Sequence, residues 1–171
     1  MLISTMRPKR DPEAPTLFLD FDGVLHPDAV YRVRGEIVLY AEGVALFEWA
    51  PLLDEYLIPY SELQIVLSTS WVRVLGFDVA RGWLPEGLQR RVVGATWHRQ
   101  GPRDWVFLTR YEQIILNVRR HQHSRWLAID DMGDGWADEH REHLVLTDST
   151  RGLGPVEVQE ELREKLEVLC R

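Results

Sequence analysis

Five short apolar runs are spread along the chain, and longer polar or amphipathic stretches separate them. Each run has the length of an ordinary strand. At least three of them are apolar throughout, which is typical of parallel strands covered on both faces. The stretches between them have helical character, so the order predicts βαβ units and a mostly parallel sheet. The expected strands are residues 16–20, 64–68, 91–95, 126–130 and 143–147.

Apolar residues recur at helical spacing in three further stretches, namely residues 41–60, 109–122 and 156–170. Each stretch is expected to turn one apolar face toward the core. Pro51 lies inside the first of them and predicts that this helix bends or restarts. Thr109 is the expected N-cap of the second helix.

Residues 31–40 have another pattern, in which two short β-prone arms flank Arg34 and Gly35, and this predicts a small hairpin. With helices on both faces of a parallel sheet, the expected fold class is α/β, with a three-layer, Rossmann-like arrangement. Residues 1–15 hold few apolar side chains, so we expect a flexible N-terminal tail there. Residues 16–171 are expected to form a single domain.

The composition argues against several classes of protein. Hydrophobic residues make up 45% of the chain, and no apolar stretch approaches the roughly 20 residues of a transmembrane helix. The N-terminus lacks the apolar core of a signal peptide, so we expect a cytoplasmic protein with no membrane partner. Cys170 is the single cysteine, which excludes an internal disulfide and a cysteine-based metal site. A formal net charge of −7 argues against broad electrostatic attraction to nucleic acid.

Polar side chains follow three of the expected strands, at the point where each strand ends. They are Asp20 and Asp22, then Ser68, Thr69 and Ser70, then Asp130 and Asp131. In an open parallel sheet, ligands bind beyond the carboxyl ends of the strands, so these groups are expected to meet at one edge. Clustered carboxylates repel one another and need a cation, and ligation by oxygen alone suits Mg²⁺.

Each of these features has a plain structural explanation when it is taken alone. An aspartate before a glycine is commonly a turn residue, and a Ser-Thr-Ser segment after a strand is commonly a helix cap. Paired aspartates are common in solvated loops. Their joint occurrence, each after an apolar strand and in this order, favours a functional site.

The same segments resemble the motifs of a known family. "FLDFDGVLHP" (residues 18–27) is similar to the first motif of the haloacid dehalogenase (HAD) superfamily, an apolar strand followed by DxDG. "IVLS" (residues 65–68) resembles its second motif, and "WLAIDD" (residues 126–131) resembles its fourth. "LSTSW" and "AIDD" resemble in particular the HAD domain group of Swiss-army-knife RNA-repair-like proteins.

The resemblance implies a magnesium-dependent phosphatase that works through an aspartyl-phosphate intermediate. Asp20 would be the nucleophile, and Asp22 would protonate the leaving group and then activate water. Ser68 would donate a hydrogen bond to a phosphoryl oxygen. Asp130 and Asp131 would hold Mg²⁺ together with Asp20 and Asp22, the latter through its backbone carbonyl.

The third motif of the family usually supplies a lysine, and here the sequence departs from the pattern. Lys9 precedes the first motif and Lys165 follows the fourth, so neither is placed for this role. We expect Arg110 to replace the lysine, because it begins the helix that leads into the strand 126–130. Its planar fork of donors can brace both Asp20 and a phosphoryl group. The alternatives are Arg73, Arg99 and Arg103.

Four residues are expected to contact the substrate: Gly23, His26, Thr69 and Arg73. Neither gap between the motifs is long enough for a full cap domain, so the site is expected to be open. An open site admits large substrates, and the resemblance suggests nucleotide or nucleic-acid-end phosphates. The basic, tryptophan-containing loop 95–110 is the candidate contact segment, and an oligomer is compatible with such a site. Asp134 is an alternative further metal ligand.

The missing lysine leaves a second function open. In this reading the chain is a catalytically impaired HAD-like module that binds a nucleotide or a protein partner. A receiver-like phosphoacceptor domain also uses clustered acids and Mg²⁺, but it needs a lysine at the end of a late strand, and none is available here.

Overall fold

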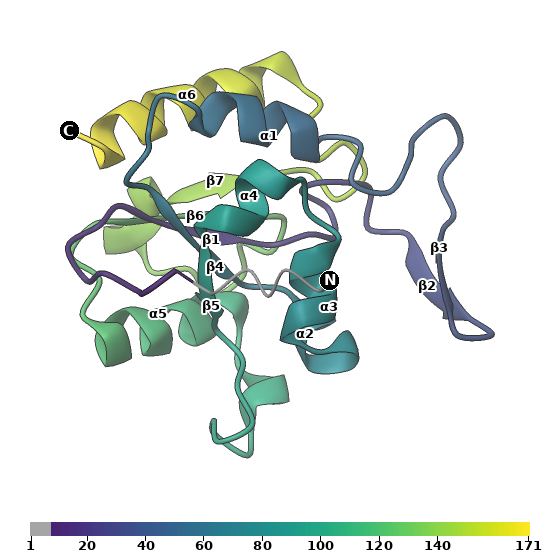
Figure 1. Cartoon of the computed structure of the whole chain (residues 1–171), viewed down its shortest axis with the longest axis horizontal. Helices are drawn as coiled ribbons and strands as arrows, with labels where there is room; N and C mark the ends of the chain where they lie inside the picture. Colours follow the sequence, from purple (N-terminus) through teal and green to yellow (C-terminus); the bar gives the residue numbers. More distant parts are fainter. Residues whose placement is uncertain (1–7) are drawn as a thin grey trace, which may run out of the picture.

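The computed structural model describes residues 8–171, and its centre is a five-stranded sheet (Figure 1). The strands are β1 Thr16–Leu19, β4 Gln64–Leu67, β5 Val92–Ala95, β6 Trp126–Asp130 and β7 Leu144–Leu146. They lie in the order β5-β4-β1-β6-β7, and every neighbouring pair is parallel. All five expected strands are present, and the predicted Rossmann-like α/β class is confirmed.

Alternating side chains of the central strand serve two separate cores, because successive residues of a strand point to opposite faces. Leu17 and Leu19 are fully buried in a cluster that includes Leu162. Phe18 points the other way and packs in a second cluster with Ile114. Both faces of the sheet therefore need a helical cover, which gives the three layers.

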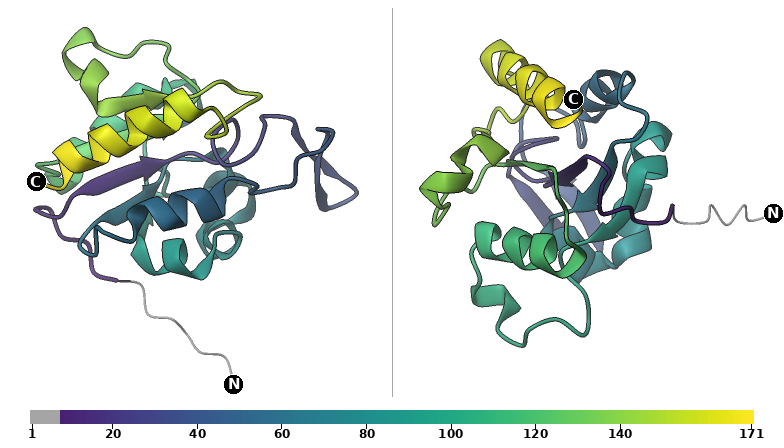
Figure 2. Two further views of the ribbon diagram at one scale, coloured as in Figure 1. Left: turned by 90° about the horizontal axis from the view of Figure 1, so that it is seen from above. Right: turned by 90° about the vertical axis from the view of Figure 1, so that its left-hand side faces the viewer.

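Three longer helices supply most of this cover: α1 Ala50–Leu57, α5 Arg110–His121 and α6 Val156–Leu169. Helices α1 and α6 lie side by side on one face of the sheet, and α5 lies on the other (Figures 1 and 2). The Tyr56 hydroxyl of α1 donates a hydrogen bond of 2.8 Å to Gln159 of α6, which ties these two helices together.

The first helix is shorter than the periodicity of residues 41–60 predicts. It begins at Ala50, with Pro51 in its first turn, where a missing N–H costs no helical hydrogen bond. Gly43 and Phe47 have φ values of 72° and 57°, and left-handed backbone of this kind interrupts a helix. The helix therefore begins next to Pro51, where the sequence predicts a bend or a restart.

Three helices of six residues each were not visible as periodic patterns: α2 Ser70–Leu75, α3 Phe77–Gly82 and α4 Glu86–Arg91. Six residues make fewer than two turns, so a stripe of apolar residues has no room to repeat. The same holds for the 3₁₀ helices η1 Trp105–Phe107 and η2 Asp138–His143.

The predicted hairpin is present as β2 Val30–Val33 and β3 Glu36–Leu39, an antiparallel pair that projects from the body (Figure 1). Arg34 and Gly35 form its turn, with φ values of 51° and 89°. Two positive φ values in succession suit the right-handed twist of the flanking strands. Within residues 8–171, the chain between β1 and β4 forms this hairpin and α1, and no cap domain is inserted there.

The N-terminal segment is described from residue 8 onward, so residues 1–7 of the expected flexible tail lie outside the described residues. Asp11 exchanges two hydrogen bonds with Gln64, which is the first residue of β4. The Pro12 carbonyl accepts a hydrogen bond from the Ser124 amide. This part of the tail is thus fastened to the sheet, while the division into tail and domain stays a prediction. Among the described residues, no helix has both the length and the apolarity needed to cross a membrane.

Thr109 caps α5 through a reciprocal pair of hydrogen bonds, and this generates a first prediction. Its Oγ1 accepts the Glu112 amide at 3.2 Å, and the Glu112 carboxylate accepts the Thr109 amide at 2.7 Å. We expect Thr109→Ala to lower the free energy of unfolding by about 1 kcal/mol. Urea denaturation measures this, with Thr109→Ser as the control that keeps the cap. Equal stability of the alanine and serine variants would contradict the role of the cap.

Candidate active site

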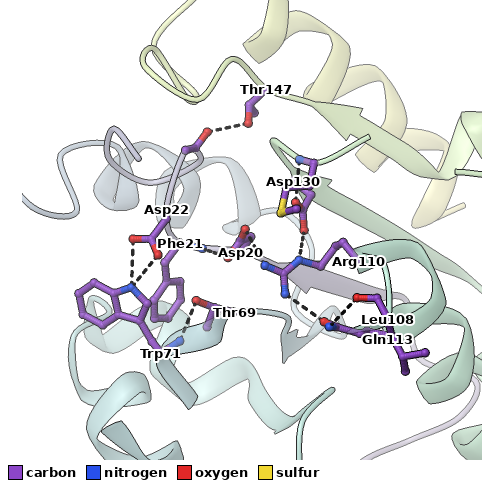
Figure 3. Close-up of polar contacts among 12 residues, drawn as sticks. Asp20, Phe21, Asp22, Thr69, Trp71, Leu108, Arg110, Gln113, Asp130 and Thr147 are labelled. Carbon is purple, nitrogen blue, oxygen red and sulfur yellow. Dashed lines mark hydrogen bonds and ion pairs between the residues drawn. The ribbon is translucent and has the colours of Figure 1, made fainter. Parts of the chain in front are cut away.

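The register of the sheet brings the polar strand ends together. Leu19 at the end of β1 pairs with Leu67 of β4 on one side and with Ile129 of β6 on the other. The residues that follow in each strand therefore emerge at one edge, level with one another. They are Asp20, Ser68 and Asp130, of which Figure 3 labels Asp20 and Asp130.

Asp20 is buried, and both of its carboxylate oxygens have donors. Oδ1 accepts the Phe21 amide at 2.8 Å, and Oδ2 accepts a hydrogen bond from Nη2 of Arg110 at 3.2 Å (Figure 3). Burial raises the pKa of Asp20 well above its ordinary value, and the positive charge of Arg110 offsets part of that rise. The carboxylate is thus held in one orientation at the end of the strand.

Arg110 connects the first and the last acidic strand ends. It is the first residue of α5, and its Nε lies 2.9 Å from Oδ2 of Asp130, an ion pair without hydrogen-bond alignment. Burial opposes the charge of the guanidinium, but the carboxylates of Asp20 and Asp130 outweigh it and raise the pKa of Arg110. The side chain of Gln113 accepts a further hydrogen bond from Arg110 at 3.3 Å. Arg110 thus lies between Asp20 and Asp130, and its role in place of the usual lysine stays a prediction.

The paired acids at the end of β6 differ in their surroundings. Asp130 is fully buried, and its Oδ1 accepts the Met132 amide at 2.9 Å. Burial raises the pKa of Asp130 to about 7, against the opposing effect of Arg110. Asp131 is partly exposed, and burial together with the Asp28 carboxylate raises its pKa to about 6. Both acids therefore hold a proton more readily than an ordinary aspartate, and nearby positive charge favours their ionised forms.

Gly23 lets the chain pass close to Asp131. A Cβ at this position would lie 2.2 Å from Oδ2 of Asp131, and the φ of 72° is left-handed. The Gly23 amide donates to the His26 carbonyl at 2.9 Å, and its own carbonyl accepts the Thr147 hydroxyl at 2.7 Å. The structure thus places Gly23, an expected substrate contact, in the turn that shapes the site.

Ser68 and Thr69 have different local roles. The Ser68 hydroxyl is buried and has no hydrogen-bond partner in the described part of the chain. An unpaired buried hydroxyl is unfavourable, so this atom fits a partner supplied by a ligand. Thr69 instead caps α2, where its Oγ1 accepts the Trp71 amide at 3.4 Å. The helix-cap explanation of the Ser-Thr-Ser segment therefore holds for Thr69.

Asp22 lies beside Asp20 on the hairpin side, and two rings donate to it. The His26 Nε2 lies 3.0 Å from its Oδ1, and the Trp71 Nε1 lies 3.0 Å from Oδ1 and 3.1 Å from Oδ2. His26 was expected to touch the substrate, but its side chain is fully buried behind Asp22. The Trp71 side chain is buried as well.

Two hollows open beside the carboxylates. The one on the Arg110 side has a volume of about 210 Å³, and its lining includes Thr69, Ser70, Arg73, Arg110, Gln113 and Met132. The one on the Asp22 side has about 150 Å³ and lies between the hairpin and α2, with Tyr31, Arg32 and Val74 in its wall. Ser70 lines both, so the hollows flank one continuous rim.

The chain was compared with models of known protein families. A family model described as the HAD domain in Swiss Army Knife RNA repair proteins matches residues 16–158. The chain belongs to this family. The match contains all the strand ends described above, and it confirms the resemblance of the motifs to the HAD superfamily. Searches of curated proteins and of solved structures find no match.

Membership of the HAD superfamily indicates phosphatase-type hydrolase chemistry on a phosphorylated substrate. The acidic edge of the sheet also fits a metal ion, which HAD proteins generally use. One carboxylate oxygen from each of Asp20, Asp130 and Asp131 lies within 4.8 Å of the other two. This all-oxygen set suits a hard dication such as Mg²⁺. The side chains of Asp22 and Asp134 are outside this group among the described residues.

Sequence reasoning missed Gln113 as part of this HAD site. Its side-chain amide donates to the carbonyls of Trp105 and Leu108, both at 3.3 Å, while its oxygen accepts from Arg110. Gln113 thereby links the guanidinium to the loop before α5. The signal available in the sequence was its position three residues after Arg110, on the same face of the helix.

The raised pKa of Asp130 gives a prediction for the metal-free HAD domain. Between about pH 4 and pH 7 the folded chain keeps a proton on Asp130 that the unfolded chain releases. This carboxyl therefore makes a contribution to the free energy of unfolding that falls as the pH rises through that window. Asp130→Asn removes the titration, so we expect its stability relative to wild type to increase with pH. Urea denaturation with a chelator present measures this, and a difference independent of pH would refute it.

Proposed function

We propose that this protein is a magnesium-dependent phosphatase that hydrolyses phosphomonoesters through an aspartyl-phosphate on Asp20. The observation that carries the proposal is the placement of Asp20. It is buried at the end of β1, oriented by the Phe21 amide and by Arg110, and adjacent to the carboxylates of Asp130 and Asp131. A carboxylate fixed in this way is suited to act as a nucleophile.

In the first step, an Asp20 oxygen attacks phosphorus, and the bond from phosphorus to the leaving oxygen breaks. Asp22 gives its proton to that oxygen, so the leaving group departs as an alcohol. The hollow of about 150 Å³ on the Asp22 side is where the leaving group fits, because a general acid must lie within hydrogen-bond distance of it. In the second step, Asp22 takes a proton from water, which attacks phosphorus and releases phosphate and free Asp20.

The other groups of the edge hold the phosphoryl group. Arg110 and the unpaired Ser68 hydroxyl are the donors that face its oxygens in this proposal. Asp20, Asp130 and Asp131 would hold Mg²⁺, and the ion would supply positive charge that offsets the repulsion between the nucleophile and the anionic phosphate. The Asp22 backbone carbonyl is proposed as a further ligand of the ion.

Nucleotides and nucleic-acid ends are the substrates that we propose. The name of the matched family refers to RNA repair proteins, and the rim of the sheet has no cap domain within residues 8–171. Arg99 and Arg103 lie exposed in the loop before α5, where a nucleic-acid backbone can reach them. Thr69 and Arg73 line the hollow on the Arg110 side and remain proposed substrate contacts. A cytoplasmic location is likewise proposed, on composition alone.

A catalytically impaired binding module was the alternative, and its basis was the missing lysine. Arg110 contacts both Asp20 and Asp130, which are the groups that a lysine at this position would face. This observation favours the enzyme over the binding module.

The nucleophile provides the direct test. We expect Asp20→Asn to reduce hydrolysis of p-nitrophenyl phosphate by at least about 1,000-fold, because an amide cannot form the phosphoenzyme. Removal of divalent metal by a chelator is expected to abolish turnover by wild type, and Mg²⁺ to restore it. Steady-state kinetics measure both effects. Undiminished activity of Asp20→Asn, or activity that survives complete removal of metal, would show that the mechanism is wrong.

Arg110 provides a second test. A lysine ammonium is a single point charge and cannot replace the fork that reaches two carboxylates at once. We therefore expect Arg110→Lys to lower kcat/KM by about tenfold or more. Arg90→Lys is the matched control, because Arg90 is an exposed arginine of α4 that pairs with Glu86. An Arg110→Lys enzyme as active as the Arg90→Lys enzyme would exclude a role for the fork.

A further inference from the structure

The carboxylate of Asp22 is held by two aromatic N–H donors. The His26 ring lies 3.0 Å from Oδ1, and the Trp71 indole N–H is shared between Oδ1 at 3.0 Å and Oδ2 at 3.1 Å (Figure 3 shows Trp71 and Asp22). The Asp22 side chain is itself 24% exposed, so it faces the open rim while both donors lie behind it. Neither of these side-chain hydrogen bonds belongs to the hydrogen bonding of the sheet.

The hydrogen bonds of His26 determine which ring nitrogen carries the proton. The Phe47 amide can only donate, and it lies 3.2 Å from Nδ1, so Nδ1 is an acceptor. In the neutral ring the proton is then on Nε2, which points at Asp22. The ring is fully buried, and its contact with the Phe47 ring at a centroid distance of 4.8 Å keeps it in place.

Trp71 is equally restricted. Its indole nitrogen is a donor only, and the side chain is buried. The rings of Phe21, Phe47 and Trp83 surround it at centroid distances of 5.6, 5.3 and 5.6 Å. Its backbone amide donates to Thr69, which anchors it in the first turn of α2. Rotation of the indole away from Asp22 would therefore disturb these three packed rings.

We infer that His26 and Trp71 are positioning residues, which hold Asp22 for proton transfer to the leaving group. Oδ1 receives both donors, whereas Oδ2 shares only one of them and retains an unused lone pair. Oδ2 is thus the atom that carries the transferred proton. The inference rests on the proposed function, because it assigns these two residues to the acid–base step of that reaction. The His26 side chain is fully buried, whereas Trp71 also lines the hollow proposed for the leaving group.

The test compares two phosphate esters that differ in their need for a proton. The alkoxide of glycerol 2-phosphate must be protonated as it leaves, whereas the phenolate of 2,4-dinitrophenyl phosphate leaves without a proton. General acid catalysis contributes about 10²–10⁴-fold, and misorientation of the acid forfeits part of it. We expect Trp71→Phe to lower kcat/KM for glycerol 2-phosphate about tenfold and to leave the value for the dinitrophenyl ester within about twofold.

Three further variants separate positioning from packing. His26→Gln keeps an N–H for Asp22 and an acceptor for Phe47. It is therefore expected to retain the wild-type ratio of kcat/KM for glycerol 2-phosphate to kcat/KM for the dinitrophenyl ester. His26→Leu removes both and is expected to lower the ratio as Trp71→Phe does. Trp83→Phe is the matched control, because Trp83 packs on Trp71 and Phe47 without serving as a donor to Asp22. Thermal unfolding verifies that each variant is folded.

The outcomes distinguish this inference from the proposed function. If Trp71→Phe and Trp83→Phe lower kcat/KM equally for both esters, the rings serve packing alone and the positioning role is refuted, while the phosphatase stands. If His26→Leu keeps the wild-type ratio, His26 does not position Asp22. If wild type with Mg²⁺ hydrolyses neither ester, the proposed function itself fails, and the inference fails with it.

Discussion

One guanidinium between two buried carboxylates is the interaction on which this site depends. Asp20 and Asp130 end neighbouring parallel strands, and the register leaves them no freedom to move apart. Two like charges buried at this separation would destabilise the fold without a counter-charge. Arg110 supplies it from a third element, because the capped start of α5 points its first side chain at the edge of the sheet. The balance of charge at the site therefore depends on the strand register and on the position at which α5 begins.

The acids divide into two groups with different needs. Asp20, Asp130 and Asp131 lie together, have raised pKa values and call for positive charge. Asp22 lies outside this group, and its carboxylate accepts hydrogen bonds from the rings of His26 and Trp71. In the proposed mechanism, this separation would allow Asp20 to face a cation while Asp22 exchanges a proton.

The strands and the edge at which they end were predictable, since apolar runs followed by acids are local patterns and parallel strands share their direction. An arginine in the third motif was expected because no lysine was available, and Arg110 was chosen over Arg73, Arg99 and Arg103 because it begins the helix that leads into the strand 126–130. Its contacts with Asp20 and Asp130 follow from that position. The burial of His26 was not predictable, because it results from a turn at Gly23 that folds residue 26 back beside Asp22. Nor was the contact from Trp71, since it joins residues 49 positions apart through six-residue helices that show no periodicity.

The hairpin β2–β3 projects from the body, as Figure 1 shows, and it shares a hollow with α2 beside Asp22. Within residues 8–171, no cap domain is inserted between β1 and β4. Enzymes with lids often spend their turnover time on opening and closing. For the proposed phosphatase working without a lid, encounter would depend on diffusion and on the orientation of the incoming phosphate. The rate of substrate association would then depend on solvent viscosity and on the mobility of a large substrate, and it would not depend on hinge flexibility.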